Sequence, residues 1–299
     1  MKPQQLDISK FCQAHHIAPE PFITNYKNTY APLLNSIVER YFSLGKKPMF
    51  IGLNGAQGSG KSTLASLMCE ILTKQFSLNT VQLSIDDLYK TRLNRQQMAK
   101  STHPLFATRG VPGTHDINLG LSLFNLLADQ SCREVLLPRF DKASDEQLPE
   151  QQWGKLTALP DIVIFEGWCV GTIAQKESQL ATAINSLEAK QDGQMVWRKR
   201  VNQELKQSYR QLFSYIDFLI FLKAPDYSCV FQWRQEQEQK LIKKLKQTNK
   251  NLSRTMNDEQ LKNFMMYFER LTRHNLETMP SYADITIELN EDRTPKLAL

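Results

Sequence analysis

Residues 55–62 read GAQGSGKS and form the stretch of the sequence best suited to hold phosphate. They fit the pattern G-x-x-x-x-G-K-[ST], with a strand-like apolar run before them and a helical pattern after them. Glycines let the backbone bend so that its N–H groups face inward, where they and the helix N-terminus bind phosphate oxygens. Lys61 adds a charge for the β- and γ-phosphates, and the Ser62 hydroxyl can ligate Mg²⁺. The predicted nucleotide-binding residues are Gly55, Ala56, Gln57, Gly58, Ser59, Gly60, Lys61, Ser62 and Thr63.

The run DIVIFEG, residues 161–167, supplies two acids that could hold the metal. Asp161 and Glu166 are separated by roughly 16 Å on an extended strand. Ligands of an open α/β sheet bind at the carboxyl ends of its strands, where Glu166 lies. Glu166 is therefore the predicted metal-side acid, and Asp161 is read as a strand-start or turn residue.

A second acid pair, Asp86 and Asp87, follows the strand candidate at 80–86. A kinase needs a carboxylate that orients the acceptor hydroxyl and takes its proton. One acid can face the acceptor and the other the phosphates, and the residues alone leave open which does which. Asp87 joins Ser62 and Glu166 as a metal candidate. A helix N-cap near Leu88 is the structural alternative.

Residues 103–116, HPLFATRGVPGTHD, predict a structured loop that presents polar side chains. Arg109 could hold a carboxylate through a bidentate fork. His103, His115 and Asp116 could bind hydroxyls, although Asp116 could equally cap the helix that begins at Ile117.

Basic groups recur in PRFDK, residues 138–142. Two basic clusters with few aromatic neighbours suit a small anion better than a stacked base. The predicted acceptor-binding residues are Asp86, Arg109, His115, Arg139 and Lys142.

Strand and helix patterns alternate along most of the chain and predict an α/β fold with a buried parallel sheet. Residues 1–47 read as a helical extension, and 48–299 as the catalytic domain. A polar loop is predicted at 141–160. The predicted strands are 49–55, 80–86, 133–140, 161–167, 217–225 and 283–290, and the predicted helices are 61–76, 117–130 and two within 226–276.

Composition narrows the class of protein further. The 299 residues carry a net charge of +6, which suits an anionic ligand. No apolar run reaches the roughly 20 residues of a membrane span, and no signal-peptide core is seen. Five scattered cysteines without a CxxC pair predict reduced thiols and a cytoplasmic protein. The sequence leaves the oligomeric state open.

The order GAQGSGKS, SIDDLY, TRGVPGTHD, LPRFDK, FEGW and LKAPDYSCVFQWRQEQE resembles the P-loop kinases of the D-glycerate 3-kinase group. This group is similar to pantothenate kinase, uridine kinase and phosphoribulokinase. The resemblance covers about residues 48–290. It implies a P-loop NTPase fold of three α/β/α layers, a mainly parallel five-stranded core sheet with the P-loop strand beside the Glu166 strand, and a helical lid.

The resemblance also implies ATP and Mg²⁺ as cofactors and a small anionic hydroxy acid, D-glycerate first, as the acceptor. Asp86 matches the family's base, and Arg109 falls in the segment that shapes the acceptor pocket. Arg234 falls on the lid helix that touches the ATP phosphates, so it joins Asp86 and Lys61 among the predicted catalytic residues. One departure is DKASDEQLPEQQW, which lacks the glycines and arginines that the family carries there.

Other functions stay open on the sequence alone. Pantothenate, a nucleoside or a sugar phosphate could replace the hydroxy acid as acceptor. A GTPase-like or non-catalytic nucleotide-binding protein is a further alternative, but NKNL at 249–252 lacks the Asp of the guanine-reading N-K-x-D motif. Nucleic-acid binding rests only on the modest basic balance and is disfavoured.

Overall fold

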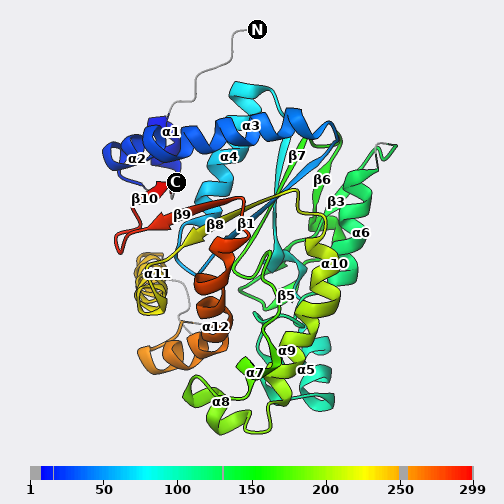
Figure 1. Cartoon of the computed structure of the whole chain (residues 1–299), viewed down its shortest axis with the longest axis vertical. Coiled ribbons are helices and arrows are strands. Elements are labelled where there is room, and N and C mark those ends of the chain that lie inside the picture. Colours follow the sequence, from blue (N-terminus) through cyan, green and yellow to red (C-terminus); the bar gives the residue numbers. More distant parts are fainter. Residues whose placement is uncertain (1–7, 16, 130, 249–254, 298–299) are drawn as a thin grey trace.

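The computed structural model describes residues 8–15, 17–129, 131–248 and 255–297. Its central sheet has the strand order β10–β9–β8–β1–β7–β2 (Figure 1). Five of these strands run parallel, and β10 pairs antiparallel at one edge. The strands are β1 (Met49–Gly55), β2 (Thr80–Ser84), β7 (Ile162–Gly167), β8 (Phe218–Lys223), β9 (Ile285–Leu289) and β10 (Pro295–Leu297).

Helices cover both faces of this sheet, which confirms the predicted three-layer α/β fold (Figure 1). On one face, Phe124 packs against Phe50 and Phe165, with ring centroids 4.9 and 5.0 Å apart. The main helices of the catalytic part are α4 (Lys61–Phe76), α5 (Arg92–Ser101), α6 (Ile117–Ala128), α9 (Val196–Glu204), α10 (Arg210–Phe213), α11 (Tyr227–Gln247) and α12 (Asp258–Thr278). Shorter helices are α7 (Glu177–Leu180), α8 (Ser186–Gln191) and the π-helix η5 (Leu205–Tyr209). No described helix has the length and apolar character needed to cross a membrane.

The N-terminal extension is helical, as predicted for its described residues. It contains α1 (Ile8–Ala14), α2 (Pro19–Asn25), a π-helical turn η1 (Tyr26–Tyr30) and α3 (Ala31–Leu44). Leu33, Leu34 and Ile37 are buried in the same hydrophobic cluster as the central strands. Asp161 fixes the end of the extension, since it accepts hydrogen bonds from Tyr41 Oη at 3.0 Å and from Lys47 Nζ at 2.5 Å. Its role as a strand-start residue is confirmed.

A strand forms within the predicted stretch 133–140, but it is short and lies outside the central sheet. It is β3 (Val135–Leu137), and it pairs with β6 (Gly154–Leu156) in a separate two-stranded sheet. The polar stretch 141–160 is not all loop, because β4 (Phe140–Asp141) and β5 (Glu146–Gln147) form a second small hairpin. Short 3₁₀ turns complete the connections: η2 (Ile85–Leu88), η3 (Pro104–Ala107), η4 (Glu150–Gln152) and η6 (Met279–Ser281).

Gly167 shows how tightly the end of β7 packs against η2. A Cβ at this position would lie 2.3 Å from Ile85 Cγ2. We therefore expect Gly167→Ala to lower the free energy of unfolding by about 1–3 kcal/mol, because η2 must shift. Urea denaturation measures the change, and Gly193→Ala is the matched control since its nearest neighbour would lie at 4.0 Å. Equal stability of the two variants would contradict the close packing.

Candidate active site

The P-loop connects β1 to α4 and lies at the carboxyl edge of the sheet, where positive backbone φ angles of 80° at Gly58 and 88° at Gly60 shape the turn. Ser62, the second residue of α4, donates a hydrogen bond of 2.9 Å to Glu166 Oε1 of the neighbouring strand β7. Glu166 is buried, and its other oxygen, Oε2, has no protein partner.

A buried, unsatisfied carboxylate oxygen beside a serine hydroxyl fits a Mg²⁺ site. The described residues contain no cluster of three or more His, Cys, Asp or Glu side chains that could cage a metal. Mg²⁺ does not need such a cage, because it binds through one or two carboxylates, waters and substrate phosphates. Ser62 and Glu166 are thus the protein groups whose geometry suits the ion.

The acid pair lies in η2, which directly follows β2, and neither acid caps a helix. Ser84 is the N-cap, and its hydroxyl accepts from Asp86 N at 3.3 Å. Asp86 accepts hydrogen bonds from Lys142 Nζ at 2.6 Å and from Tyr89 Oη at 2.8 Å. Burial would raise the pKa of Asp86, but Lys142 and then Lys61 outweigh it and lower that pKa to about 2. Asp86 is therefore ionised at neutral pH.

Asp87 contacts the segment that follows β3. Its carboxylate accepts from Phe140 N at 3.1 Å and from an Arg139 guanidinium nitrogen at 3.3 Å. Burial raises the pKa of Asp87 above its ordinary value, against these two contacts. The geometry ties Asp87 to the segment after β3, so its part in metal binding stays a prediction with less support than that of Glu166.

Arg109 pairs with an acid, Asp145, that the sequence did not predict as a site residue. Its guanidinium pairs with Asp145, which also accepts from Arg95 at 2.6 Å. Both guanidinium groups lie over the ring of Phe140, at 5.6 Å for Arg109 and 6.0 Å for Arg95. Arg95 is fully buried, whereas the Arg109 side chain is 29% exposed. Two cations thus share one carboxylate at the acceptor side, with Arg109 as the accessible one.

The histidines and Asp116 of the 103–116 segment are used for packing and capping. His115 is buried and stacks on Tyr89 at 4.5 Å between ring centroids, and its Nδ1 contacts Tyr209 Oη at 2.5 Å. Asp116 caps α6 by accepting from Leu119 N at 3.0 Å, which is the alternative weighed from the sequence. His103 contacts the Gln191 carbonyl at 3.0 Å. Direct binding of acceptor by His115 stays a prediction.

The lid helices α11 and α12 have nearly the predicted bounds. Trp233 of α11 packs on the P-loop so closely that a Cβ at Gly58 would lie 2.6 Å from Trp233 Cβ. Arg293, which sequence reasoning missed, donates to the Gly58 carbonyl at 2.9 Å and lies over the Trp233 ring at 5.2 Å. Arg234 pairs with the buried Glu238 at 2.7 Å on its own helix. A contact of Arg234 with phosphate stays a prediction, and NKNL at 249–252 lies outside the described residues.

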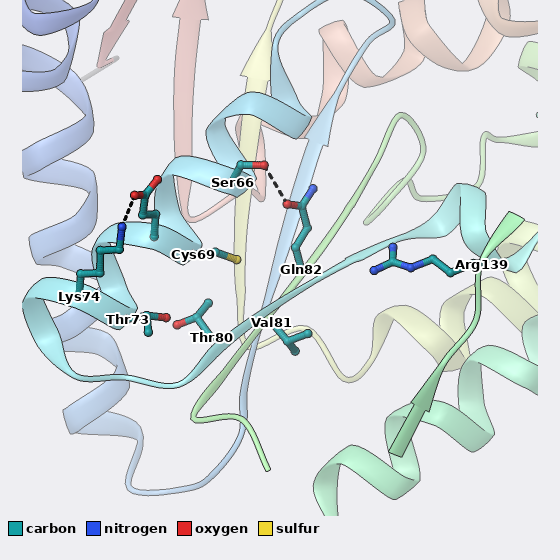
Figure 2. Close-up of a pocket in the computed structure, with 9 residues that line it drawn as sticks. Ser66, Cys69, Thr73, Lys74, Thr80, Val81, Gln82 and Arg139 are labelled. Atoms are coloured by element: carbon teal, nitrogen blue, oxygen red, sulfur yellow. Dashed lines mark hydrogen bonds and ion pairs between the residues drawn. The ribbon is translucent and has the colours of Figure 1, made fainter. Parts of the chain in front are cut away.

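A groove of about 510 Å³ lies between α4 and the open edge of β2. Figure 2 shows the side chains of Ser66 and Gln82 joined across it by a hydrogen bond of 3.1 Å, with Arg139 on its far side. Neither Asp86 nor Glu166 lines this groove, so the groove is not the candidate reaction site.

Comparison with known proteins agrees with this geometry. The uncharacterized kinase mug58 of Schizosaccharomyces pombe is 32% identical over 230 residues, which cover 74% of this chain and 79% of that protein. The chain belongs to the P-loop kinases. This kinase is also 24% identical to the chloroplastic D-glycerate 3-kinase of Arabidopsis thaliana, over 84% of its own length and 54% of that protein. The chain thus spans about half the length of the Arabidopsis relative.

A solved structure shows the same fold. D-glycerate 3-kinase from Cryptococcus neoformans var. grubii matches with a TM-score of 0.70 and 24% identity, covering 88% of this kinase and 95% of that chain. No family model matches the sequence. This protein is therefore a P-loop kinase related to D-glycerate 3-kinase, whose acceptor has to be argued from the site.

His115 makes the stability of this kinase depend on pH. Burial lowers the pKa of His115 from 6.5 to about 3, so the folded state keeps the imidazole neutral while the unfolded chain binds a proton. This stability is fully present above pH 6.5 and is lost as the pH falls toward 3, by up to about 1.4 kcal/mol per pH unit. His115→Gln should flatten that slope in urea denaturation at pH 4–6.5. His15→Gln, in the exposed turn after α1, is the control, and equal slopes for parent and His115→Gln would refute the assignment.

Proposed function

We propose that this kinase transfers the γ-phosphoryl group of ATP to the hydroxyl of a small hydroxy acid, with D-glycerate as the first candidate. The observation that carries the proposal is the convergence of Ser62, Glu166 and Asp86 at one sheet edge, with Arg109 near the acid pair through the β4–β5 hairpin. The similarity to the D-glycerate 3-kinases of Arabidopsis and Cryptococcus supports the same acceptor class.

The proposed reaction follows from the charges of the site. The acceptor oxygen forms a bond to the γ-phosphorus, and the bond from that phosphorus to the β–γ bridging oxygen breaks, which releases ADP. Asp86 accepts a hydrogen bond from the hydroxyl and takes its proton, while Lys61 stabilises the charge on the transferred group. Mg²⁺, held by Ser62 and Glu166, would neutralise the phosphate oxygens.

Acceptor recognition requires an anion-binding group near Asp86. Arg109 and Arg95 share the single carboxylate of Asp145, which leaves positive charge available at the accessible Arg109. Lys142, whose side chain is 60% exposed, adds a second cation beside Asp86. A bound hydroxy acid would place its hydroxyl at Asp86 and its carboxylate at Arg109.

A coupled ADP-release assay tests the function directly. ATP and Mg²⁺ are supplied with hydroxy acids, nucleosides, sugar phosphates and pantothenate in turn. The proposal expects turnover to be stimulated by D-glycerate or a close hydroxy acid. Stimulation by a nucleoside or pantothenate alone would replace the acceptor class, and no stimulation by any acceptor would favour a nucleotide-binding protein.

Asp86→Asn separates binding from transfer. The amide keeps the shape but cannot take the proton, so we expect kcat to fall by about 100-fold or more while the Kd for ATP changes less than about twofold. Turnover assays measure kcat, and ATP titration measures the Kd. Asp129→Asn, at the end of α6 where Asp129 bonds Ser131, is the control. Undiminished turnover in Asp86→Asn would rule out the proposed base.

Arg109→Lys tests the acceptor end. Lysine keeps the charge but lacks the planar fork, so the KM for the acid acceptor should rise about tenfold with the KM for ATP unchanged. Arg92→Lys, on the exposed first turn of α5, is a matched control. An unchanged acceptor KM in Arg109→Lys would move anion recognition to another residue.

A further inference from the structure

The two edges of the central sheet differ in their protection against pairing with a further strand. At one edge, β10 has only three residues, and two of them are Pro295 and Lys296. Shortness, proline and lysine are features by which edge strands avoid such pairing. At the other edge, β2 has five residues, and its sequence TVQLS contains neither a charge nor a proline. Of the two edges, β2 is therefore the one suited to accept another strand.

The outer side of β2 is open. In the part of the chain that the structure describes, β2 pairs with β7 alone, so the backbone groups on its other side face no strand. The groove of about 510 Å³ beside α4 lies along this edge. Figure 2 shows Thr80, Val81 and Gln82 of β2 near Ser66 and Thr73 of α4. The groove therefore exposes both the strand edge and the adjoining face of α4.

We propose that the kinase forms a homodimer in which β2 of one copy pairs antiparallel with β2 of a second copy, so that the two central sheets become one. The occupant of the groove is thus another copy of this chain. Such a contact uses the same surface on both copies and closes on itself, as most homodimers do. The inference goes beyond the proposed function and does not rest on it, because it involves no ligand of the candidate site.

The sequence of β2 is complementary to itself in this arrangement. Gln82 is the middle residue of the strand, so a two-fold axis at this position places Gln82 opposite its own copy. Thr80 then faces Ser84 of the second copy, and these two hydroxyls can hydrogen-bond. Val81 faces Leu83 of the second copy and forms an apolar pair. Both kinds of pair stabilise antiparallel strands, and no like charges meet.

Charges on α4 add to this complementarity. Glu70 and Lys74 lie one turn apart, line the groove and pair with each other. The helix packs against β2, with a hydrogen bond of 3.1 Å between Ser66 and Gln82. A two-fold axis normal to the sheet therefore brings the two α4 helices to the same face, running in opposite directions. Glu70 of one copy then lies toward Lys74 of the second copy, so that opposite charges meet across the dimer.

The proposed contact also reaches the neighbourhood of the acid pair. Arg139 lines the same groove and pairs with Asp87 at 3.3 Å. Asp87 in turn lies in η2, which directly follows β2. The dimer interface therefore borders the candidate acceptor site of each copy.

Charge reversal at the two-fold axis tests the inference, with the mass of the full chain measured by sedimentation equilibrium between about 1 and 100 µM. We expect the parent to reach the mass of a dimer. Gln82→Lys and Gln82→Glu each place two like charges opposite one another, so each should raise the Kd of the dimer at least about tenfold. An equimolar mixture of the two variants should dimerise like the parent, because lysine then faces glutamate. Gln194→Lys, in the exposed turn before α9, is the matched control and should behave as the parent.

Hydrogen exchange of the parent gives a readout that does not depend on a variant's folding. Amides of residues 80–84 should exchange more slowly as the protein concentration rises, whereas those of β10 should not change. Three results would overturn the inference: a parent that is monomeric over the whole range, an unchanged dimer in Gln82→Lys, or exchange of residues 80–84 that is independent of concentration. A mixture that stays monomeric although both variants keep the parent's circular dichroism would overturn the placement of the axis at Gln82.

Discussion

The register of three neighbouring parallel strands determines the site. Leu53 of β1 lies beside Glu166 of β7, and Glu166 lies beside Ser84 of β2. The P-loop begins within two residues of that line and Asp86 lies two residues past it, so Ser62, Glu166 and Asp86 lie at one edge of the sheet. Because side chains alternate between faces, a slip of one residue would turn Glu166 away from Ser62. β1 and β7 are buried along their whole length, whereas β2 at the edge is buried only at Leu83.

The parts of the fold that the sequence predicts well are those whose signal is local. The bounds of β1 and α4 follow from the P-loop pattern, and the long apolar runs place β7, β8 and β9 to within two residues. The strand expected at 133–140 is shortened to β3 and lies in a separate small sheet, because its pairing depends on β6, in a polar stretch without strand periodicity. Edge strand β10 is missed because three residues after a turn carry no periodicity.

The candidate site likewise contains some residues that local sequence patterns predict and others that they do not. Lys61, Glu166 and Asp86 are reached from a motif and from the rule that ligands bind where parallel strands end. The sequence does not predict Arg95 as a site residue, because α5 is a polar helix on which Arg95 resembles a solvent-exposed charge. Its burial depends on Asp145, fifty positions further along the chain. A buried ion pair between distant segments leaves no local pattern to read.

The exposure of these charges indicates which of them can exchange partners when an acceptor binds. Arg95 is fully buried, so removing its carboxylate partner would leave an uncompensated charge at a high cost. Lys142 is mostly exposed, and water can replace Asp86 as its partner at little cost. An acceptor hydroxyl can therefore displace Lys142 from Asp86 more easily than an acceptor carboxylate can displace Asp145 from Arg95. In the proposed function, recognition of the acceptor falls to Arg109 and Lys142, and the Arg95–Asp145 pair keeps Asp145 beside Arg109.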